Sequence, residues 1–293
     1  MNEKNAYRFK MLGLVTLYNP APQEATANIL RYIHDVDTLI IWDNSPLEKD
    51  LQKQILENLT DEAKKVIWHG DGQNYCIAPA INFAWKYGDE HGFDLLLLMD
   101  QDSQWENFAG YRQTIDQLLV NGKMCAFTPY VRGNDQWEIK EEIQVIRMFI
   151  NSGTVIPLQI LKSLNGADEV FPLDALDYDL ALRIIKRGYY SCCLTSFILN
   201  HTIGQPKRAS IFHLYTPNYG AARTYSIVFS HIVNYRKNHR WMTPYERRRE
   251  LKEFLFWKLV RILFAEKEKY ERMKMYLKGI RDGLLFDMNK TKP

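Results

Sequence analysis

Two aspartates one residue apart, Asp100 and Asp102, are the side chains of this sequence best suited to chemistry. They belong to the tetrapeptide Asp-Gln-Asp-Ser at 100–103, which follows the leucine-rich run 93–99. Such a run predicts a strand buried on both faces, and open α/β sheets bind ligands at the carboxyl ends of their strands. Carboxylates there need a partner or a metal, and Mg²⁺ and Mn²⁺ bind one or two carboxylates together with substrate phosphates. The pair therefore predicts a divalent cation site, with a polar turn that closes the strand as the simpler alternative.

The elements that must position these aspartates alternate between strand and helix over the first 100 residues. This alternation, with apolar strands, indicates a parallel sheet and a Rossmann-like half. No glycine-rich phosphate loop follows the first strand, so a dinucleotide-binding fold of the usual kind is not expected. We expect strands at 11–17, 38–42, 65–68, 93–99, 126–128, 154–156 and 196–199, and helices at 21–32, 47–59 and 74–87.

Composition points to a globular protein of the cytoplasm. The chain has 293 residues, of which 46% are hydrophobic, enough for one large domain or a domain with an appendage. Residues 1–10 are polar, without the apolar core of a signal peptide, and no apolar stretch approaches the roughly 20 residues that span a bilayer. The four cysteines (Cys76, Cys125, Cys192 and Cys193) lack metal-ligand spacing, so we expect free thiols in a reducing compartment.

Charge is distributed unevenly along the chain. Residues 236–293 hold 17 Lys/Arg against 8 Asp/Glu, whereas the rest of the chain holds 21 against 27. A basic tail on an acidic body predicts an anionic partner near the C-terminus, either a membrane or a polyanion.

The basic tail also has an amphipathic helical pattern. Thr243, followed by Pro244 and Glu246, predicts a helix start. A helical stripe allows two interpretations: packing on the catalytic domain or on a second copy in a homodimer, or docking of residues 241–293 on anionic lipid as a peripheral membrane contact. The aromatic residues of the tail fall on this apolar spacing, so nucleic-acid binding is not expected. The stripe consists of Leu251, Phe254, Leu255, Leu259, Ile262 and Leu263.

Five motifs occur in the order found in family 2 glycosyltransferases, and the chain resembles that family over residues 11–225. They are Thr-Leu-Tyr-Asn-Pro at 16–20, Asp-Asn-Ser at 43–45, Asp-Gln-Asp-Ser at 100–103, Asn-Ser-Gly-Thr at 151–154 and the acidic segment 171–183, followed by Asn-His-Thr-Ile-Gly at 200–204. The likeness is greatest to the rhamnosyltransferase-type branch. It implies a GT-A fold with a mixed central sheet in residues 1–225, divided into a Rossmann-like nucleotide-binding half at about 1–105 and an acceptor-side half at about 106–225. Residues 226–293 would form a basic amphipathic helical extension.

The resemblance implies an inverting, metal-dependent hexosyltransferase that uses a nucleoside diphosphate sugar. Asp102 would bind Mn²⁺ or Mg²⁺, and His201 would be the third protein ligand, since imidazole suits Mn²⁺ better than Mg²⁺. Asp100 would face the ribose or share the metal.

The resemblance places the nucleotide over the ends of the first two strands. Thr16 and Tyr18 would line the base pocket, and Asp43 would accept the N3–H of a pyrimidine, although a turn residue is its simpler role. The family commonly has a glycine before Ile77, where this chain has Tyr75-Cys76. The full expected nucleotide-binding set is Thr16, Tyr18, Asn19, Asp43, Asn44, Asn74, Ala78, Asp100 and Gln101.

Inversion requires a general base opposite the leaving group. The family pattern places it six residues before an Arg, which selects Asp177. Asp179 could instead stabilise a helix dipole, and Asp174 could cap the helix or contact the acceptor. The expected donor- and acceptor-side residues are Ser152, Gly153, Asp174, Asp179 and Arg223.

The expected function is transfer of L-rhamnose from dTDP-rhamnose to a surface glycan or its lipid-linked precursor, as in cell-wall, capsule or O-antigen synthesis, at the inner face of the plasma membrane. UDP-hexose or UDP-galactofuranose are alternative donors. A non-catalytic glycan-binding or scaffold protein on the same fold is the alternative of another class, and the presence of Asp102, Asp177 and His201 together disfavours it.

Overall fold

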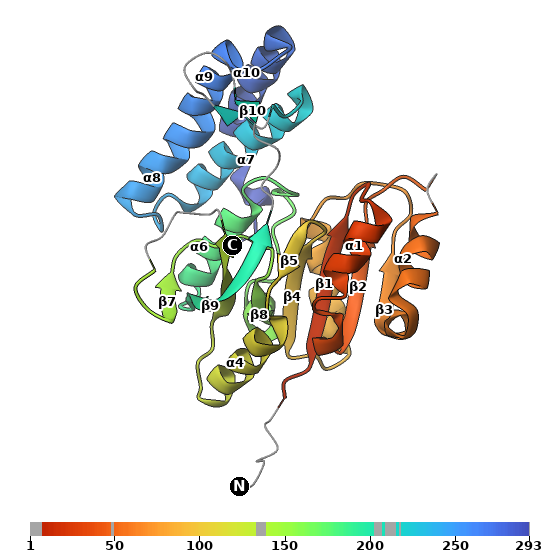
Figure 1. The fold of residues 1–293 in the computed structure, drawn as a ribbon. Helices are drawn as coiled ribbons and strands as arrows, with labels where there is room; N and C mark the ends of the chain where they lie inside the picture. The colour runs from red at the N-terminus through yellow and green to blue at the C-terminus, as the bar shows by residue number, and fades with distance from the viewer. Residues whose placement is uncertain are drawn as a thin grey trace, which may run out of the picture. The chain divides into compact units, whose positions relative to one another are not determined.

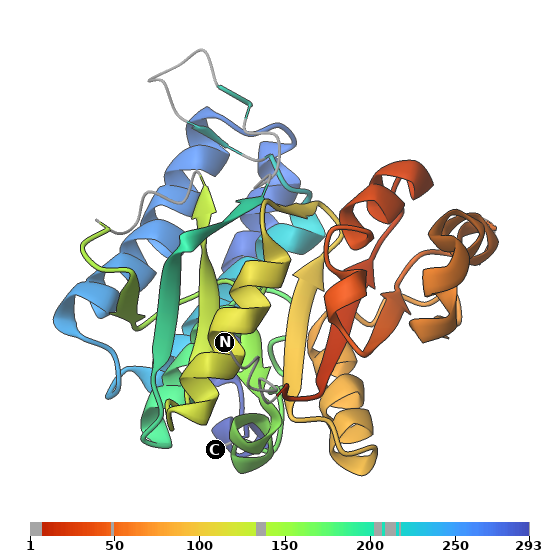
Figure 2. The ribbon, with the colours of Figure 1, turned by 60° about the horizontal axis from the view of Figure 1, so that its bottom comes forward.

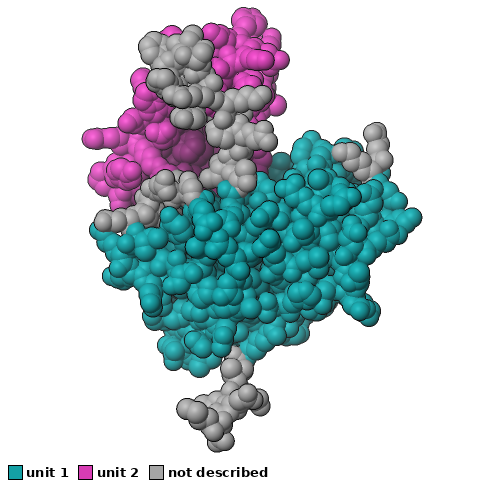
Figure 3. All heavy atoms as spheres, in the orientation of Figure 1, with its two compact units in different colours: residues 1–167, 183–201 teal, residues 168–182, 202–293 magenta. Residues whose placement is uncertain are grey.

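The computed structural model describes residues 8–47, 50–132, 139–201, 207–208, 215–216 and 218–292. The chain divides into two compact units (Figure 3). Unit 1 comprises residues 1–167 and 183–201, and unit 2 comprises residues 168–182 and 202–293. The predicted division at residue 225 stays a prediction, and helix α7 (Ala221–Asn238) runs across this position.

Unit 1 is built on one mixed sheet (Figure 1). Its order is β3-β2-β1-β4-β8-β6-β9-β5, and β7 pairs with β9. The first four strands of this order are parallel, and β8 turns the sheet antiparallel by pairing with both β4 and β6. The strands are β1 Met11–Leu17, β2 Thr38–Asp43, β3 Val66–His69, β4 Leu95–Asp100, β5 Ser103–Trp105, β6 Ala126–Arg132, β7 Ile143–Ile146, β8 Val155–Pro157 and β9 Ser191–His201.

Helices cover both faces of this sheet. Strand side chains alternate between the faces, so Val15, Ile41 and Leu97 lie in one core with side chains of α1, α2 and α4. Figure 2 shows α4 lying across that face. On the other face α3 approaches β1 and α5 closely, because a Cβ on Gly88 would lie 2.7 Å from the Leu158 side chain. These helices are α1 Pro22–Ile29, α2 Leu51–Leu59, α3 Ala78–Glu90, α4 Phe108–Val120 and α5 Leu158–Ser163, with 3-10 turns η1 Ile33–Asp35 and η2 Thr60–Lys65. Helix α6 (Leu176–Lys186) begins in unit 2 and ends in unit 1.

The predicted elements agree with the structure except at some ends. The strand expected at 93–99 begins at Leu95, because Phe93 N bonds Gly88 O at the end of α3 and the Asp94 carboxylate accepts from Lys10 N. It also extends to Asp100, so this aspartate is the last strand residue. All four cysteines are free thiols.

Unit 2 contains a group of helices and a short hairpin of β10 (Lys207–Arg208) and β11 (Tyr215–Thr216). The predicted helix start is confirmed: Thr243 and Glu246 form a reciprocal capping box at the start of α8. Part of the predicted stripe packs inside, since Leu255, Leu259 and Ile262 belong to a core with α7 and α10. Among the described helices, none combines the length and apolar character that a membrane span needs. The remaining helical bounds are α8 Pro244–Leu251, η3 Lys252–Phe256, α9 Trp257–Phe264, α10 Lys269–Leu285 and η4 Met288–Lys290.

Candidate active site

Asp100, Asp102 and His201 come together at the carboxyl edge of the sheet, and we call them the acidic centre. Asp100 ends β4 beside Thr16 of β1, and His201 ends β9 opposite Ser103 of β5. One ligand atom from each of the three residues lies within 4.8 Å of the others. Asp100 and Asp102 precede His201 by 101 and 99 positions and share a site with it because β4 and β9 end at the same edge of the sheet.

The electrostatics of the acidic centre favour a cation. Burial of its carboxyl group raises the pKa of Asp100 to about 6; His201 opposes this rise, and the neighbouring Asp102 adds to it. His201 Nδ1 lies 3.5 Å from Asp102 Oδ1, and the Asp102 side chain is 45% exposed. Carboxylate and imidazole donors are a set that Mn²⁺ accepts. The residues present therefore fit a divalent cation, which would supply the positive charge that the two carboxylates need.

Two buried serines, Ser103 and Ser152, orient this centre. The sequence predicted a donor- or acceptor-side role for Ser152 but no contact of either serine with His201. Ser103 Oγ lies 2.8 Å from His201 Nδ1 and 2.6 Å from Ser152 Oγ. Ser152 Oγ also accepts from Asp100 N at 3.2 Å. Because Ser103 engages Nδ1, the imidazole can turn Nε2 toward a ligand, which is the arrangement by which outer groups fix metal-binding histidines.

Gln101 is tied to the backbone of Tyr18. Its side chain accepts from Tyr18 N at 2.7 Å and donates to Tyr18 O at 3.3 Å, and its own carbonyl accepts from Asn28. The carboxamide therefore holds the loop after β1, and Tyr18 itself remains 54% exposed. A direct nucleotide contact by Gln101 stays a prediction.

The segment after β2 is organised mainly by Asn44. This buried side chain accepts from Tyr75 N and donates to Cys76 O, so it fixes the stretch before α3. Asp43 ends β2 and accepts from Ser45 N at 2.8 Å through Oδ1. The nearby Ser45 Oγ accepts from Asn19 N.

The expected nucleotide contacts Asn74 and Ala78 lie on either side of a turn. Asn74 is exposed and its side chain accepts from Cys76 N, whereas Ala78 is buried at the first position of α3. Cys76 has a φ of +62°, in the region that favours glycine. This explains why a glycine is common near this position in the family that the sequence resembles.

Gly153 sits in a tight backbone turn next to Ser152. Its φ is +78°, and a Cβ there would lie 2.7 Å from the Pro129 ring and 2.9 Å from Leu199. Its carbonyl accepts from the Tyr111 hydroxyl at 3.2 Å. The local packing by itself therefore requires glycine, and a contact with donor or acceptor stays a prediction.

In unit 2, Asp177 and Asp179 lie in the first turn of α6. Asp177 is half-buried. Asp179 is fully buried and accepts from Lys237 Nζ at 2.6 Å and from Asn238 at 3.0 Å. Lys237 also pairs with Asp168 at 2.7 Å, and we call Asp168, Asp179 and Lys237 the Lys237 cluster.

The other two acceptor-side candidates of unit 2 form an ion pair. Arg223 of α7 donates to Asp174 Oδ1 from both Nε, at 3.1 Å, and Nη2, at 3.0 Å. The Asp174 side chain is only 8% exposed, so it is the arginine that reaches the surface.

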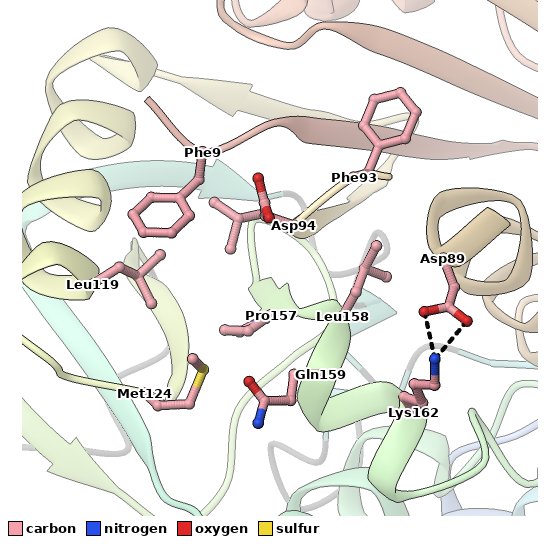
Figure 4. Close-up of a pocket in the computed structure, with 11 residues that line it drawn as sticks. Phe9, Asp89, Phe93, Asp94, Leu119, Met124, Pro157, Leu158, Gln159 and Lys162 are labelled. Carbon is pink, nitrogen blue, oxygen red and sulfur yellow. Dashed lines mark hydrogen bonds and ion pairs between the residues drawn. The ribbon is translucent and has the colours of Figure 1, made fainter. Parts of the chain in front are cut away.

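A cavity of about 310 Å³ lies at the opposite end of β4 from the acidic centre (Figure 4). It is lined mainly by apolar side chains, among them Phe9, Phe93 and Leu158, and Figure 4 shows the Asp89–Lys162 ion pair at one side. Ligands of open α/β sheets bind at the carboxyl ends of strands, so this cavity is not the expected site.

Comparison with known proteins shows a likeness to glycosyltransferases. No family model matches the chain. The dTDP-rhamnosyl transferase RfbF of Shigella flexneri is 22% identical over 292 residues, covering 93% of this chain and 94% of the relative.

Solved structures of glycosyltransferases are similar to this chain in fold. The mannosyltransferase PcManGT from Pyrobaculum calidifontis, in complex with GDP-Man and Mn²⁺, is similar over 97% of this chain and 78% of its own, with 14% identity and a TM-score of 0.57. The chain has the GT-A fold. TarS 1–349 of S. aureus, in complex with UDP-GlcNAc, matches 94% of this chain and 80% of its own, with 13% identity and a TM-score of 0.54. The predicted fold class and the resemblance to rhamnosyltransferase-type glycosyltransferases are confirmed, and the relatives support a hexosyltransferase as the class of enzyme.

Proposed function

We propose that the protein is a metal-dependent, inverting glycosyltransferase that takes its sugar from a nucleoside diphosphate. The observation that carries this proposal is the convergence of Asp100, Asp102 and His201 at the carboxyl edge of a GT-A sheet. A binding or scaffold protein would not need the half-buried Asp100 carboxylate beside a second aspartate at that edge, because an uncompensated negative charge destabilises the fold.

Asp102 and His201 are the proposed metal ligands. When bound, Mn²⁺ or Mg²⁺ would neutralise the charge that develops on the diphosphate leaving group. Ser103 and Ser152 hold the imidazole and the Asp100 backbone in place. Asp100 either shares the cation or accepts a hydrogen bond from the ribose.

The nucleotide base is proposed to lie between the loops after β1 and β2. Ser45 N occupies Asp43 Oδ1, so Oδ2 can accept the N3–H of uracil or thymine. Tyr18 is exposed beside this position and offers a ring face to the base. Gln101 and Asn44 support these loops through backbone hydrogen bonds.

Asp177 is the proposed general base, which would take the proton from the acceptor hydroxyl as the new bond forms. Its neighbour Asp179 is bound to Lys237 and Asn238, and these contacts fix the first turn of α6. We therefore assign Asp179 a positioning role. The partly exposed Arg223, held by Asp174, is proposed to contact the acceptor.

For the donor we propose dTDP-rhamnose, with a surface glycan or its lipid-linked precursor as acceptor. The support is the sequence likeness to a dTDP-rhamnosyl transferase over nearly the whole chain. A UDP sugar is the second candidate, because Asp43 would accept uracil in the same way. We also propose that the enzyme works at the inner face of the plasma membrane through residues 241–293.

The test is a transfer assay with dTDP-rhamnose, UDP-hexoses and GDP-mannose in the presence of Mn²⁺. We expect turnover with dTDP-rhamnose, loss of turnover in EDTA and its recovery when Mn²⁺ is added back. Asp177→Asn should lower turnover by about 10²- to 10⁴-fold while donor binding persists. Preference for a GDP sugar would contradict the role proposed for Asp43, and full activity in EDTA would contradict the proposed metal dependence.

A further inference from the structure

Helix α10 has one face fixed against the protein. Gly279 and Gly283 lie one turn apart on it, and a Cβ on either would come within 3.1 Å of Val228 or Ile232 of α7. Tyr276, on the same side, is buried in the core of unit 2. The absence of side chains at 279 and 283 lets the two helices pack closely, so the rotation of α10 about its own axis is determined.

The opposite face of α10 exposes large apolar side chains. Leu277 and Leu284 are each 57% exposed, Leu285 is 78% exposed and Tyr270 is 79% exposed. At 3.6 residues per turn these four side chains fall on one side of the helix. Single exposed leucines are ordinary, but several on one helix face mark an interaction surface.

Cations are interleaved with these apolar side chains. Lys274, Lys278 and Arg281 are exposed and occupy the same side of the helix by their spacing. The Lys278 ammonium lies 5.1 Å from the centroid of the Tyr225 ring, and Arg281 pairs with its neighbour Asp282 at 2.7 Å. Together with Met275 and Leu277 they line a surface groove of about 630 Å³. We call the seven residues Tyr270, Lys274, Leu277, Lys278, Arg281, Leu284 and Leu285 the outer face of α10.

We propose that the outer face of α10 docks on an anionic lipid surface. A helix that lies in the membrane interface buries apolar side chains at the acyl boundary, while its lysines and arginines extend to the phosphates. The outer face has both components, and its cations complement negatively charged headgroups. The inference deepens the membrane contact proposed above, and it moves that contact from the stripe at 251–263, part of which packs inside, to α10.

The charge of the face argues against a second copy of the chain as its partner. A two-fold interface places the same surface on both sides, so the cations of one copy would face the cations of the other. Such like-charge contacts are unfavourable. A nucleic acid would pair with the cations through its phosphates, but it would leave the leucines in contact with phosphate and water.

The experiment is co-sedimentation of the full chain with vesicles of phosphatidylcholine alone or mixed with phosphatidylglycerol. We expect binding to the mixed vesicles that weakens as salt is raised. The triple variant K274Q/K278Q/R281Q should lower the partition coefficient about 100-fold, at about fivefold per charge. A matched control, K53Q/K86Q/K123Q, removes three exposed cations of unit 1 and should bind as the wild type does.

The apolar component is tested with L277S/L284S/L285S, which should lose vesicle binding even at low salt. Circular dichroism shows whether each variant is folded, and the salt response of the wild type tests the proposal without any variant. Equal binding to both vesicle types, or wild-type sedimentation of the cation variant, would overturn it. Loss of a dimer in these variants, without vesicle binding by the wild type, would assign the face to a second copy. Because sedimentation needs no donor, its result is independent of whether transfer is observed.

Discussion

The acidic centre of unit 1 and the Lys237 cluster of unit 2 each bring two carboxylates together, but they balance charge differently. In the Lys237 cluster one ammonium lies 2.7 Å from Asp168 and 2.6 Å from Asp179, and all three side chains are at most 8% exposed. In the acidic centre Asp102 lies 3.5 Å from the His201 imidazole, and burial raises the pKa of Asp100. A cluster that supplies its own cation is part of the fold, whereas one that lacks it is suited to receive a cation from outside.

The largest expected effect comes from removing a carboxylate of the acidic centre. Asp102→Asn should lower the transfer rate by about 1000-fold, since a cation contributes several kcal/mol to stabilising the leaving group. The free energy of unfolding should change by less than about 0.5 kcal/mol, because this side chain is 45% exposed. Transfer assays and urea unfolding check the two parts, and a large loss of stability would contradict the distinction between the clusters.

The converse substitution in unit 2 is Lys237→Met. It leaves Asp168 and Asp179 buried without their ammonium, so we expect a loss of about 3–5 kcal/mol in the free energy of unfolding. Lys123→Met, at an exposed position, is the matched control and should cost little. A loss below about 1 kcal/mol for Lys237→Met would show that the cluster is not held together by this charge.

A third substitution sharpens the account of the acidic centre without removing a ligand. Ser103→Ala deletes the hydroxyl that engages His201 Nδ1, and we expect Mn²⁺ affinity to fall by about 10- to 100-fold. Titration calorimetry with Mn²⁺ alone measures this in the wild type and the variant. Unchanged Mn²⁺ affinity in the variant would show that Ser103 does not support the metal site. No Mn²⁺ binding by the wild type would contradict the metal site itself.

The smallest effect is a pH dependence of the metal-free protein. Asp100 has a folded-state pKa of about 6, above its ordinary value, so the folded protein binds more protons than the unfolded one between about pH 4 and 6. Stability should therefore fall as pH rises through this window, by about 1–2 kcal/mol after allowance for partial exposure. Asp100→Asn should lack this fall, and identical pH profiles for the two proteins would contradict it.

Much of the fold and the place of the acidic centre could be predicted from sequence. The strand before Asp100 is apolar throughout, and the end of a parallel strand fixes the edge at which its polar residues lie. Local signals also sufficed at Thr243, where the capping box is contained within four residues.

What the sequence could not show are roles that depend on distant partners. Gln101 bonds the backbone of Tyr18, 83 residues away, and no side-chain pattern marks a backbone atom as a partner. Likewise, helical spacing identified an apolar stripe at 251–263 but not its neighbours, so packing and lipid contact could not be told apart. The Gly279–Gly283 pair was the sequence signal that α10 packs on α7 through the face that carries these glycines.

The two hydrogen bonds between Gln101 and the Tyr18 backbone have a consequence for any attempt to change the donor nucleotide of the enzyme. The tetrapeptide that supplies both aspartates of the acidic centre also positions the loop on which the base is proposed to stack, through the pair of hydrogen bonds between Gln101 and the Tyr18 backbone. We therefore expect the proposed nucleobase preference and the proposed metal site to be linked through Gln101. If the proposed site is right, a substitution in the loop after β1 that exchanges the nucleotide should also change cation affinity, and we expect redesign to need a compensating change at position 101.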